Sequence, residues 1–183
     1  MSPDRQEPRG PKSLESFETV SQMATDTLLK HGSHYPMLLL DGSRENALHL
    51  LAGFAQAESG TERQMQMFAL GRQSATTNDW GDLRQAFFMM EAWFSDRSQN
   101  PSVRPSEDPN KREGLLVESY NFQTDQYNIA LFEIIRTGLD QVDLLDITEE
   151  QTKGEPVTEE NSPTLAAFVK GYSKRKPRRW FRR

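Results

Sequence analysis

The chain has 183 residues, a net charge of −5 and no cysteine. Its length suits one domain with appendages, and the lack of cysteine excludes disulfides, thiolate zinc sites and cysteine nucleophiles. The charge is segregated, with a net −6 over residues 1–139, −7 over residues 140–160 and +8 over the last fourteen residues. The pattern indicates a folded domain followed by an acidic stretch and a basic end.

The expected organisation has five parts: a disordered arm at 1–12, an α+β domain at 13–137, an acidic linker at 138–161, a short helix at 162–172 and a basic aromatic tail at 173–183. The arm is polar and proline-rich and lacks the apolar core of a signal peptide. No apolar run approaches the ~20 residues of a membrane span. We therefore expect a cytoplasmic protein.

The domain is expected to begin with a helix. Apolar residues recur there at spacings of three and four, at Leu14, Phe17, Val20, Ala24 and Leu28. Ser13 is the expected N-cap, and Gly32 is the expected C-cap.

Two strands are predicted next, at Tyr35–Leu40 and Ala47–Phe54, joined through the turn pair Asp41-Gly42. Alternation in the second strand places Leu48, Leu50, Ala52 and Phe54 on one face. Pro36 cannot donate a ladder hydrogen bond, so it belongs at the start of a strand or on an edge. The pair is expected to form a hairpin.

A second helix is predicted from a capping box at Thr61–Gln64 to about Gln73. In this interpretation the helix buries Met65, Phe68 and Ala69.

Three further strands complete the expected sheet: Leu83–Phe94, Glu113–Tyr120 and Tyr127–Arg136. The first is apolar on both faces, which is typical of a central strand in a covered sheet. The element order α-β-β-α-β-β-β predicts a five-stranded, mixed and mostly antiparallel sheet with two helices. We expect Phe88 and Phe132 to share one core.

The segment Ser162–Tyr172 carries helix signals, with serine at the N-cap, Pro163 at the first helical position and Gly171 after the end. Its apolar stripe is Leu165, Phe168, Val169 and Tyr172. The stripe either docks into a partner's groove or packs on the domain's own sheet.

The order of elements resembles the JAB/MPN metalloprotease-type fold over Leu14–Arg136. The resemblance places Thr27–Gly42 as the first helix and strand, Phe87–Ser95 as the metal-bearing strand, and Pro105–Asp108 as the Pro-Ser segment with its aspartate. The family's two metal-binding histidines are absent, because Glu91–Asp96 occupies their place. The resemblance implies a metal-free relative that serves as a scaffolding or interaction module.

Glu91 is the candidate catalytic residue. Burial in the most apolar strand would raise its pKa, as a general acid requires, and a hydrolase would combine it with the loop at 96–112. The alternative is a structural carboxylate paired with Arg84, Arg104 or Arg112.

A metal site is considered at four residues that are close in sequence: His31, His34, Asp41 and His49. The group lacks the spacing of a known metal frame, so we expect neither a metal nor a cofactor. The chain also has no Gly-x-Ser-x-Gly, phosphate loop or Gly-x-Gly-x-x-Gly motif.

The basic tail combines seven cationic residues with two aromatic ones: Lys174, Arg175, Lys176, Arg178, Arg179, Trp180, Phe181, Arg182 and Arg183. Such a segment neutralises phosphates and stacks on unpaired bases, binds an anionic membrane surface, or folds back on the acidic stretch. The sequence favours a non-enzymatic interaction or adaptor protein with a protein partner. The alternatives are a nucleic-acid-binding accessory protein that uses the tail, and the hydrolase centred on Glu91.

Overall fold

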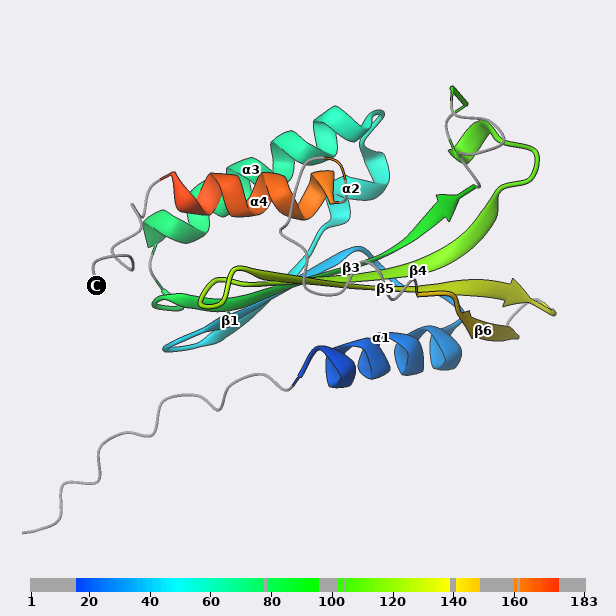
Figure 1. Ribbon diagram of the computed structural model, residues 1–183, viewed down its shortest axis with the longest axis horizontal. Helices are drawn as coiled ribbons and strands as arrows, with labels where there is room; N and C mark the ends of the chain where they lie inside the picture. The colour runs from blue at the N-terminus through cyan, green and yellow to red at the C-terminus, as the bar shows by residue number, and fades with distance from the viewer. Residues whose placement is uncertain are drawn as a thin grey trace, which may run out of the picture.

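The computed structural model forms three layers, with one antiparallel sheet between helices on both faces (Figure 1). It describes residues 16–77, 79–95, 102–103, 105–138, 141–148, 160 and 162–174. The predicted arm and all of the tail after Lys174 lie outside this part of the chain. The α+β class is confirmed.

Within these residues the sheet has six strands: β1 (Met37–Gly42), β2 (Asn46–Leu50), β3 (Leu83–Phe94), β4 (Arg112–Asn121), β5 (Gln126–Arg136) and β6 (Val142–Asp146). Their spatial order is β2-β1-β3-β4-β5-β6, and every neighbouring pair is antiparallel. The predicted five-stranded mixed sheet was therefore wrong in strand number and in strand direction. The sixth strand lies in the segment expected to be an acidic linker.

The helices are α1 (Phe17–His31), α2 (Ala52–Gln56), α3 (Gly60–Thr77) and α4 (Pro163–Ser173), with a 3-10 turn at Pro105–Glu107. Figure 1 shows α1 on one face of the sheet, and α3 and α4 side by side on the other.

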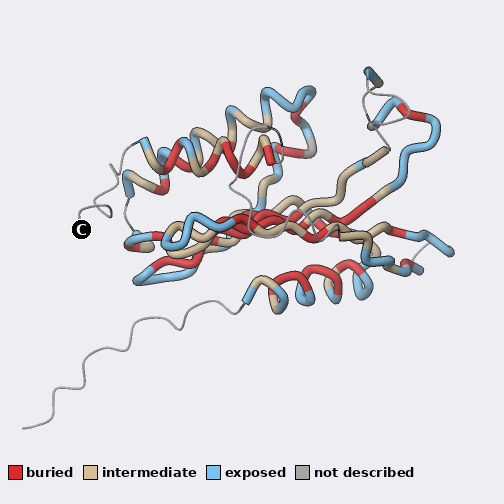
Figure 2. Tube along the Cα trace, viewed as in Figure 1, coloured by how far each residue is buried: buried red, intermediate tan, exposed pale blue. Residues whose placement is uncertain are grey.

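The sheet separates two cores, one under each helical layer. Figure 2 shows buried residues along the strands and in the helices on both sides of them. The core facing α3 and α4 contains Phe88 and Tyr127, whereas the core facing α1 contains Phe87 and Val117, with Phe132 packed against it. Successive strand residues point to opposite faces, so a sheet covered on both sides has two cores. The prediction that Phe88 and Phe132 share one core was wrong.

Helix α1 starts three residues later than predicted. Ser16 is its N-cap, and the Ser16 hydroxyl accepts a 3.4 Å hydrogen bond from the Thr19 amide. The C-cap prediction is confirmed, because Gly32 has a φ of 71° and its amide donates to the Leu28 carbonyl. A left-handed residue at this point favours glycine.

Strand β2 is shorter than predicted because its partner strand ends. Met37 pairs with Leu50, and the Leu51 amide then donates to the carbonyl of Pro36, which has no amide to donate in return. The chain turns into α2, which buries Phe54. Leu48 and Leu50 therefore do not share a buried face with Phe54, and both are exposed.

Helix α3 begins at a different capping pair from the predicted one. The Ser59 hydroxyl accepts from the Glu62 amide at 3.1 Å, and the Glu62 carboxylate accepts from the Glu58 amide at 2.9 Å. The buried face of the helix is Met67, Gly71 and Ser74. Of the three residues expected to be buried, Met65 and Ala69 are exposed and Phe68 is half-buried. The buried face of α3 differs from the predicted face because α4 packs against the side of α3 that carries Gly71.

The three long strands are confirmed, with β3 in the interior of the sheet and β4 and β5 joined as a hairpin. Asp41, expected in a turn, instead lies in β1 and is fully buried. Its carboxylate accepts from the Arg84 guanidinium, which also donates to the Gly42 carbonyl at 2.8 Å. This ion pair links β1 to β3.

Helix α4 packs on the domain's own sheet and on α3. Leu165, Phe168 and Tyr172 belong to the core that contains Phe88, and the Tyr172 hydroxyl accepts a hydrogen bond from the Leu83 amide at 3.1 Å. Gly171, predicted to follow the helix, lies inside it, because the helix continues to Ser173.

Candidate interaction surface

Strand β2 forms one edge of the sheet and carries two exposed leucines. Leu48 is 57% exposed and Leu50 is 67% exposed, although an apolar strand residue normally packs against a neighbouring layer. Their cross-strand partners Leu39 and Met37 are half-buried against the core under α1, so both leucines lie on that face of the sheet. An apolar strip therefore runs along the edge.

Among the described strands, β2 pairs only with β1, so the other side of its backbone is open. The hydrogen bond from Leu51 to Pro36 fixes the alternation, so Ala47 and His49 point their backbone groups toward β1. Asn46, Leu48 and Leu50 then direct their amides and carbonyls away from the sheet. Open backbone groups next to exposed apolar side chains are a template for pairing with another strand.

The opposite edge of the sheet is protected by charge. Strand β6 carries Asp143 and Asp146, and the Thr148 side chain beyond its end accepts the Leu131 amide at 3.1 Å. By contrast, β2 has no Asp, Glu, Lys or Arg between Asn46 and Leu50. Burial holds the pKa of His49 below its ordinary value, so the imidazole is neutral at neutral pH. The two edges therefore differ in their readiness to pair.

Glu91 is held in an ion cluster on the α1 face. One of its oxygens accepts the His34 amide, and the other accepts from Arg136 at 3.0 Å. Arg136 also donates to both oxygens of Glu113, at 2.8 and 2.7 Å, and to the Gly32 carbonyl at 2.7 Å. Burial raises the pKa of Glu91, whereas hydrogen bonding to Arg136 lowers the pKa of Glu113.

This geometry gives Glu91 a structural partner that the sequence interpretation did not name. Arg84 instead binds Asp41, Arg112 binds Glu133, and Arg104 lies outside the described residues. Both oxygens of Glu91 are engaged, and the cluster connects the C-terminal end of α1 to three strands. The arrangement favours a structural carboxylate.

A second carboxylate, whose burial the sequence interpretation did not predict, lies on the other face of the sheet. Glu118 accepts from the Tyr127 hydroxyl at 2.7 Å and from the Ser162 hydroxyl at 2.9 Å. Burial raises the pKa of Glu118 to about 7 and raises that of Tyr127 above its ordinary value. Alternation along β4 places Glu118 on the same face as Tyr120, a signal that could have identified it. Ser162 therefore tethers the start of α4 to β4 and makes no side-chain capping bond.

The four candidate metal ligands occupy separate environments. His34 is buried beside Tyr35, Asp41 binds Arg84, and His49 packs edge-on against Trp80 with ring centroids 5.5 Å apart. His31 lies in the last turn of α1. Within the described residues, no group of three or more His, Cys, Asp or Glu side chains is arranged to hold a metal ion.

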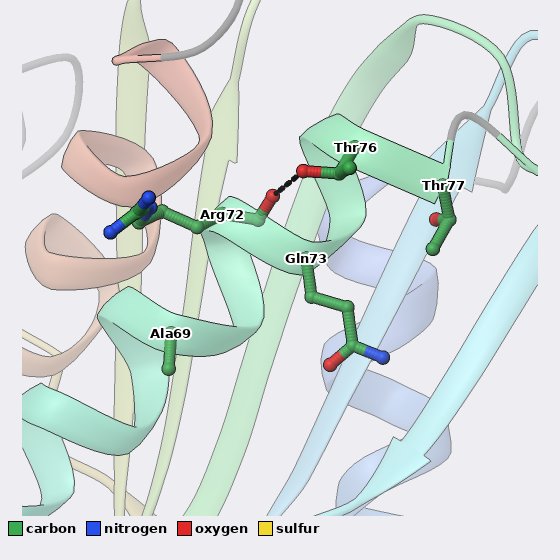
Figure 3. A pocket seen from close by; sticks show the side chains of 5 residues that line it. All are labelled: Ala69, Arg72, Gln73, Thr76 and Thr77. Carbon is green, nitrogen blue, oxygen red and sulfur yellow. Dashed lines mark hydrogen bonds between the residues drawn. The ribbon is translucent and has the colours of Figure 1, made fainter.

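A shallow open depression lies on α3 (Figure 3). It is lined by Ala69, Arg72, Gln73, Thr76 and Thr77. The Thr76 hydroxyl donates to the Arg72 carbonyl at 2.7 Å, so this polar group is satisfied within the helix. The lining offers no cluster of titratable groups that suggests chemistry.

The residues predicted for docking and polyanion binding are placed only in part. Leu165, Phe168 and Tyr172 are buried in the chain's own core, and Val169 packs against that core, so this stripe is not free for a partner in this conformation. Within the tail, Lys174 is described, with its ammonium 5.2 Å from the centre of the Phe68 ring. Ser173 ends α4, and residues 175–183 lie outside the described part of the chain.

The fold and its open edge define an α+β protein with an antiparallel sheet covered on both faces. The chain matches no protein-family model, no curated protein and no solved structure. The resemblance to the JAB/MPN-type fold therefore stays a prediction. In the described ranges, no helix combines the length and apolar composition that crossing a membrane requires.

Proposed function

We propose that this chain is a non-enzymatic interaction protein, an adaptor whose α+β domain binds a protein partner and whose basic tail contacts a partner or a polyanion. The observation that carries the proposal is the open edge of β2, with its uncharged sequence and its two exposed leucines. Peptide strands commonly bind such edges, with backbone hydrogen bonds supplying affinity and alternate side chains supplying specificity.

The edge can be tested by substitution with a matched control. Leu48→Lys with Leu50→Lys places two charges on the edge, and Met65→Lys changes a side chain on α3 that is as exposed as Leu50, at 67%. The immobilised full chain is first used to capture a protein partner. The purified partner is then titrated against the wild type, the double variant and the Met65→Lys control. We expect the double variant to weaken binding at least about tenfold and the control to leave it unchanged.

Hydrogen exchange separates strand addition from contact by side chains alone. On binding, the amides of Leu48 and Leu50 should slow, because they gain acceptors, whereas those of Ala47 and His49 are already paired with β1. If the lysine double variant binds the partner with wild-type affinity, and these amides do not change their exchange on binding, β2 is not the binding edge.

The tail supports a second candidate, a nucleic-acid-binding accessory protein. Residues 175–183 contain six cationic side chains and the pair Trp180-Phe181, which suits stacking on unpaired bases. Binding of a labelled single-stranded DNA oligonucleotide should weaken about 10²–10³-fold between ~50 and ~200 mM salt. A chain that ends at Lys174 should lose this salt-dependent binding of the oligonucleotide.

Anionic phosphatidylserine vesicles form the comparison arm. Loss of vesicle binding on truncation, without any oligonucleotide binding by the full chain, would assign the tail to a lipid surface instead. Unchanged binding of both probes after truncation would refute the polyanion role.

A further inference from the structure

We infer that the partner of β2 is a second copy of this chain, which joins the two sheets edge to edge across a two-fold axis. The inference rests on the proposed use of β2 as a docking edge and names its occupant.

Charge favours a second copy at β2. Between Asn46 and Leu50 the strand carries no formally charged side chain, so two β2 edges can approach without like-charge repulsion. Two β6 edges would bring Asp143 and Asp146 of both copies together. Self-pairing is therefore favoured at one edge of the sheet and opposed at the other.

Backbone geometry selects one register. The open residues are Asn46, Leu48 and Leu50, and antiparallel hydrogen-bonded pairing must match open residues with open residues. With Leu48 opposite the Leu48 of the second copy, Asn46 lies opposite Leu50, and all five residues of both strands are paired. Moving the axis to Ala47 or His49 leaves two strand residues of each copy unpaired.

The side chains agree with this register. Leu48 and Leu50 lie on the α1 face, so the leucines of both copies would form one row at the junction, beside Met37 and Leu39 of each sheet. On the other face, Ala47 would lie opposite His49. The pairing brings together apolar side chains that are exposed in the single chain, so that neighbouring leucines shield part of each other's surface from water.

Symmetry closes the assembly at two copies. A two-fold pairing uses the same edge on both chains, and the two outer edges are then the acidic β6 strands. The five-residue edge is short, so we expect a reversible dimer with a dissociation constant on the order of 10–100 µM. Sedimentation of the full chain across that range should show the transition from one copy to two.

Charged substitutions test whether the dimer uses this edge. Leu48→Lys with Leu50→Lys should keep the chain a single copy throughout the range, whereas Met65→Lys should dimerise as the wild type does. Each variant should fold as the wild type does, because these side chains are exposed and contribute little to the core. Circular dichroism and unfolding measurements check this.

Single cysteines test the register, because the natural chain contains none. Paired Leu48 residues would have Cα atoms about 5.5 Å apart, which a disulfide can span. Leu48→Cys should therefore oxidise to a covalent dimer. Leu50→Cys alone should not, because the two positions lie on the order of 13 Å apart along the strands. Adding Asn46→Cys to Leu50→Cys should restore crosslinking.

The outcomes separate this inference from the proposed function. A single copy at all concentrations, with a foreign protein bound at β2, would overturn the dimer and leave the interaction role standing. A single copy with nothing bound at β2 would overturn both. Equal crosslinking of Leu48→Cys, Leu50→Cys and Met65→Cys would show random collision and overturn the dimer, as would growth into large polymers.

Discussion

Gly71 of α3 and Gly171 of α4 make reciprocal contacts where the two helices cross. A Cβ added to Gly71 would overlap the Phe168 carbonyl oxygen, and one added to Gly171 would overlap the Phe68 carbonyl oxygen. Each glycine thus lets the other helix's backbone come close. This approach positions α4 over the sheet and brings Phe168 and Tyr172 into the core.

Alanine at either crossing glycine should destabilise the domain. The clash is with backbone, which cannot rotate away, so we expect Gly71→Ala or Gly171→Ala to lower the free energy of unfolding by about 1–3 kcal/mol. Gly60 is the control, because nothing lies within 4 Å of a Cβ there. If urea unfolding gives Gly171→Ala the same stability as the wild type, α3 and α4 are farther apart than the contacts at these glycines indicate.

Glu118 should make the domain less stable as the pH rises. Its pKa is about 7 in the folded state against 4.5 for the ordinary group, so the folded state holds a proton that the unfolded state releases. Its contribution is therefore most favourable below about pH 4.5 and is lost as the pH rises to about 7. The free energy of unfolding that Glu118 contributes over this pH range is on the order of 3 kcal/mol.

Glu118→Gln tests this assignment, because glutamine keeps the shape and does not titrate. Unfolding free energies at several pH values between 4.5 and 8 should fall less steeply in the variant than in the wild type. Subtracting the two profiles cancels the other titrating groups, including Glu91 and His34. Parallel profiles would contradict a buried, titrating Glu118.

Arg136 should contribute more to stability than the neighbouring Arg112. Arg136→Met leaves Glu91 and Glu113 close together without their cation and removes the bond to Gly32. Because the cluster is partly exposed, we expect a loss of about 1–2 kcal/mol. Arg112→Met, which removes one exposed pair with Glu133, should cost less than about 1 kcal/mol. Thermal unfolding at neutral pH measures both, and equal losses would argue against a bridging role for Arg136.

Helix α4 should be protected from hydrogen exchange in the isolated chain. Its apolar stripe is already buried in the domain core. The amides of α4 should therefore exchange only when α3 and the sheet unfold with it. The amide of Leu48, which points away from the sheet, is the fast-exchanging reference at low protein concentration. Fast exchange throughout α4 would restore the alternative in which this helix awaits a partner.

The candidate site was less predictable than the elements that form it. The sequence predicted a strand at Ala47–Phe54, whereas the strand observed is Asn46–Leu50. Alternation of apolar residues does not reveal where the partner strand ends. Pro36 gave a local signal, since it cannot donate beyond the pair Met37–Leu50. The exposure of Leu48 and Leu50 depends on where α1 lies, which no local pattern specifies.

By itself, the sequence determined the class of the fold, the long strands of β3, β4 and β5, the C-terminal cap of α1 and the helical nature of α4. These follow from local periodicity and capping, which neighbouring residues encode. Only the tertiary structure decided that β6 joins the sheet, that Glu91 pairs with Arg136 and that β2 is left open. Such features depend on which distant surfaces meet, because burial and ion pairing depend on neighbours in space.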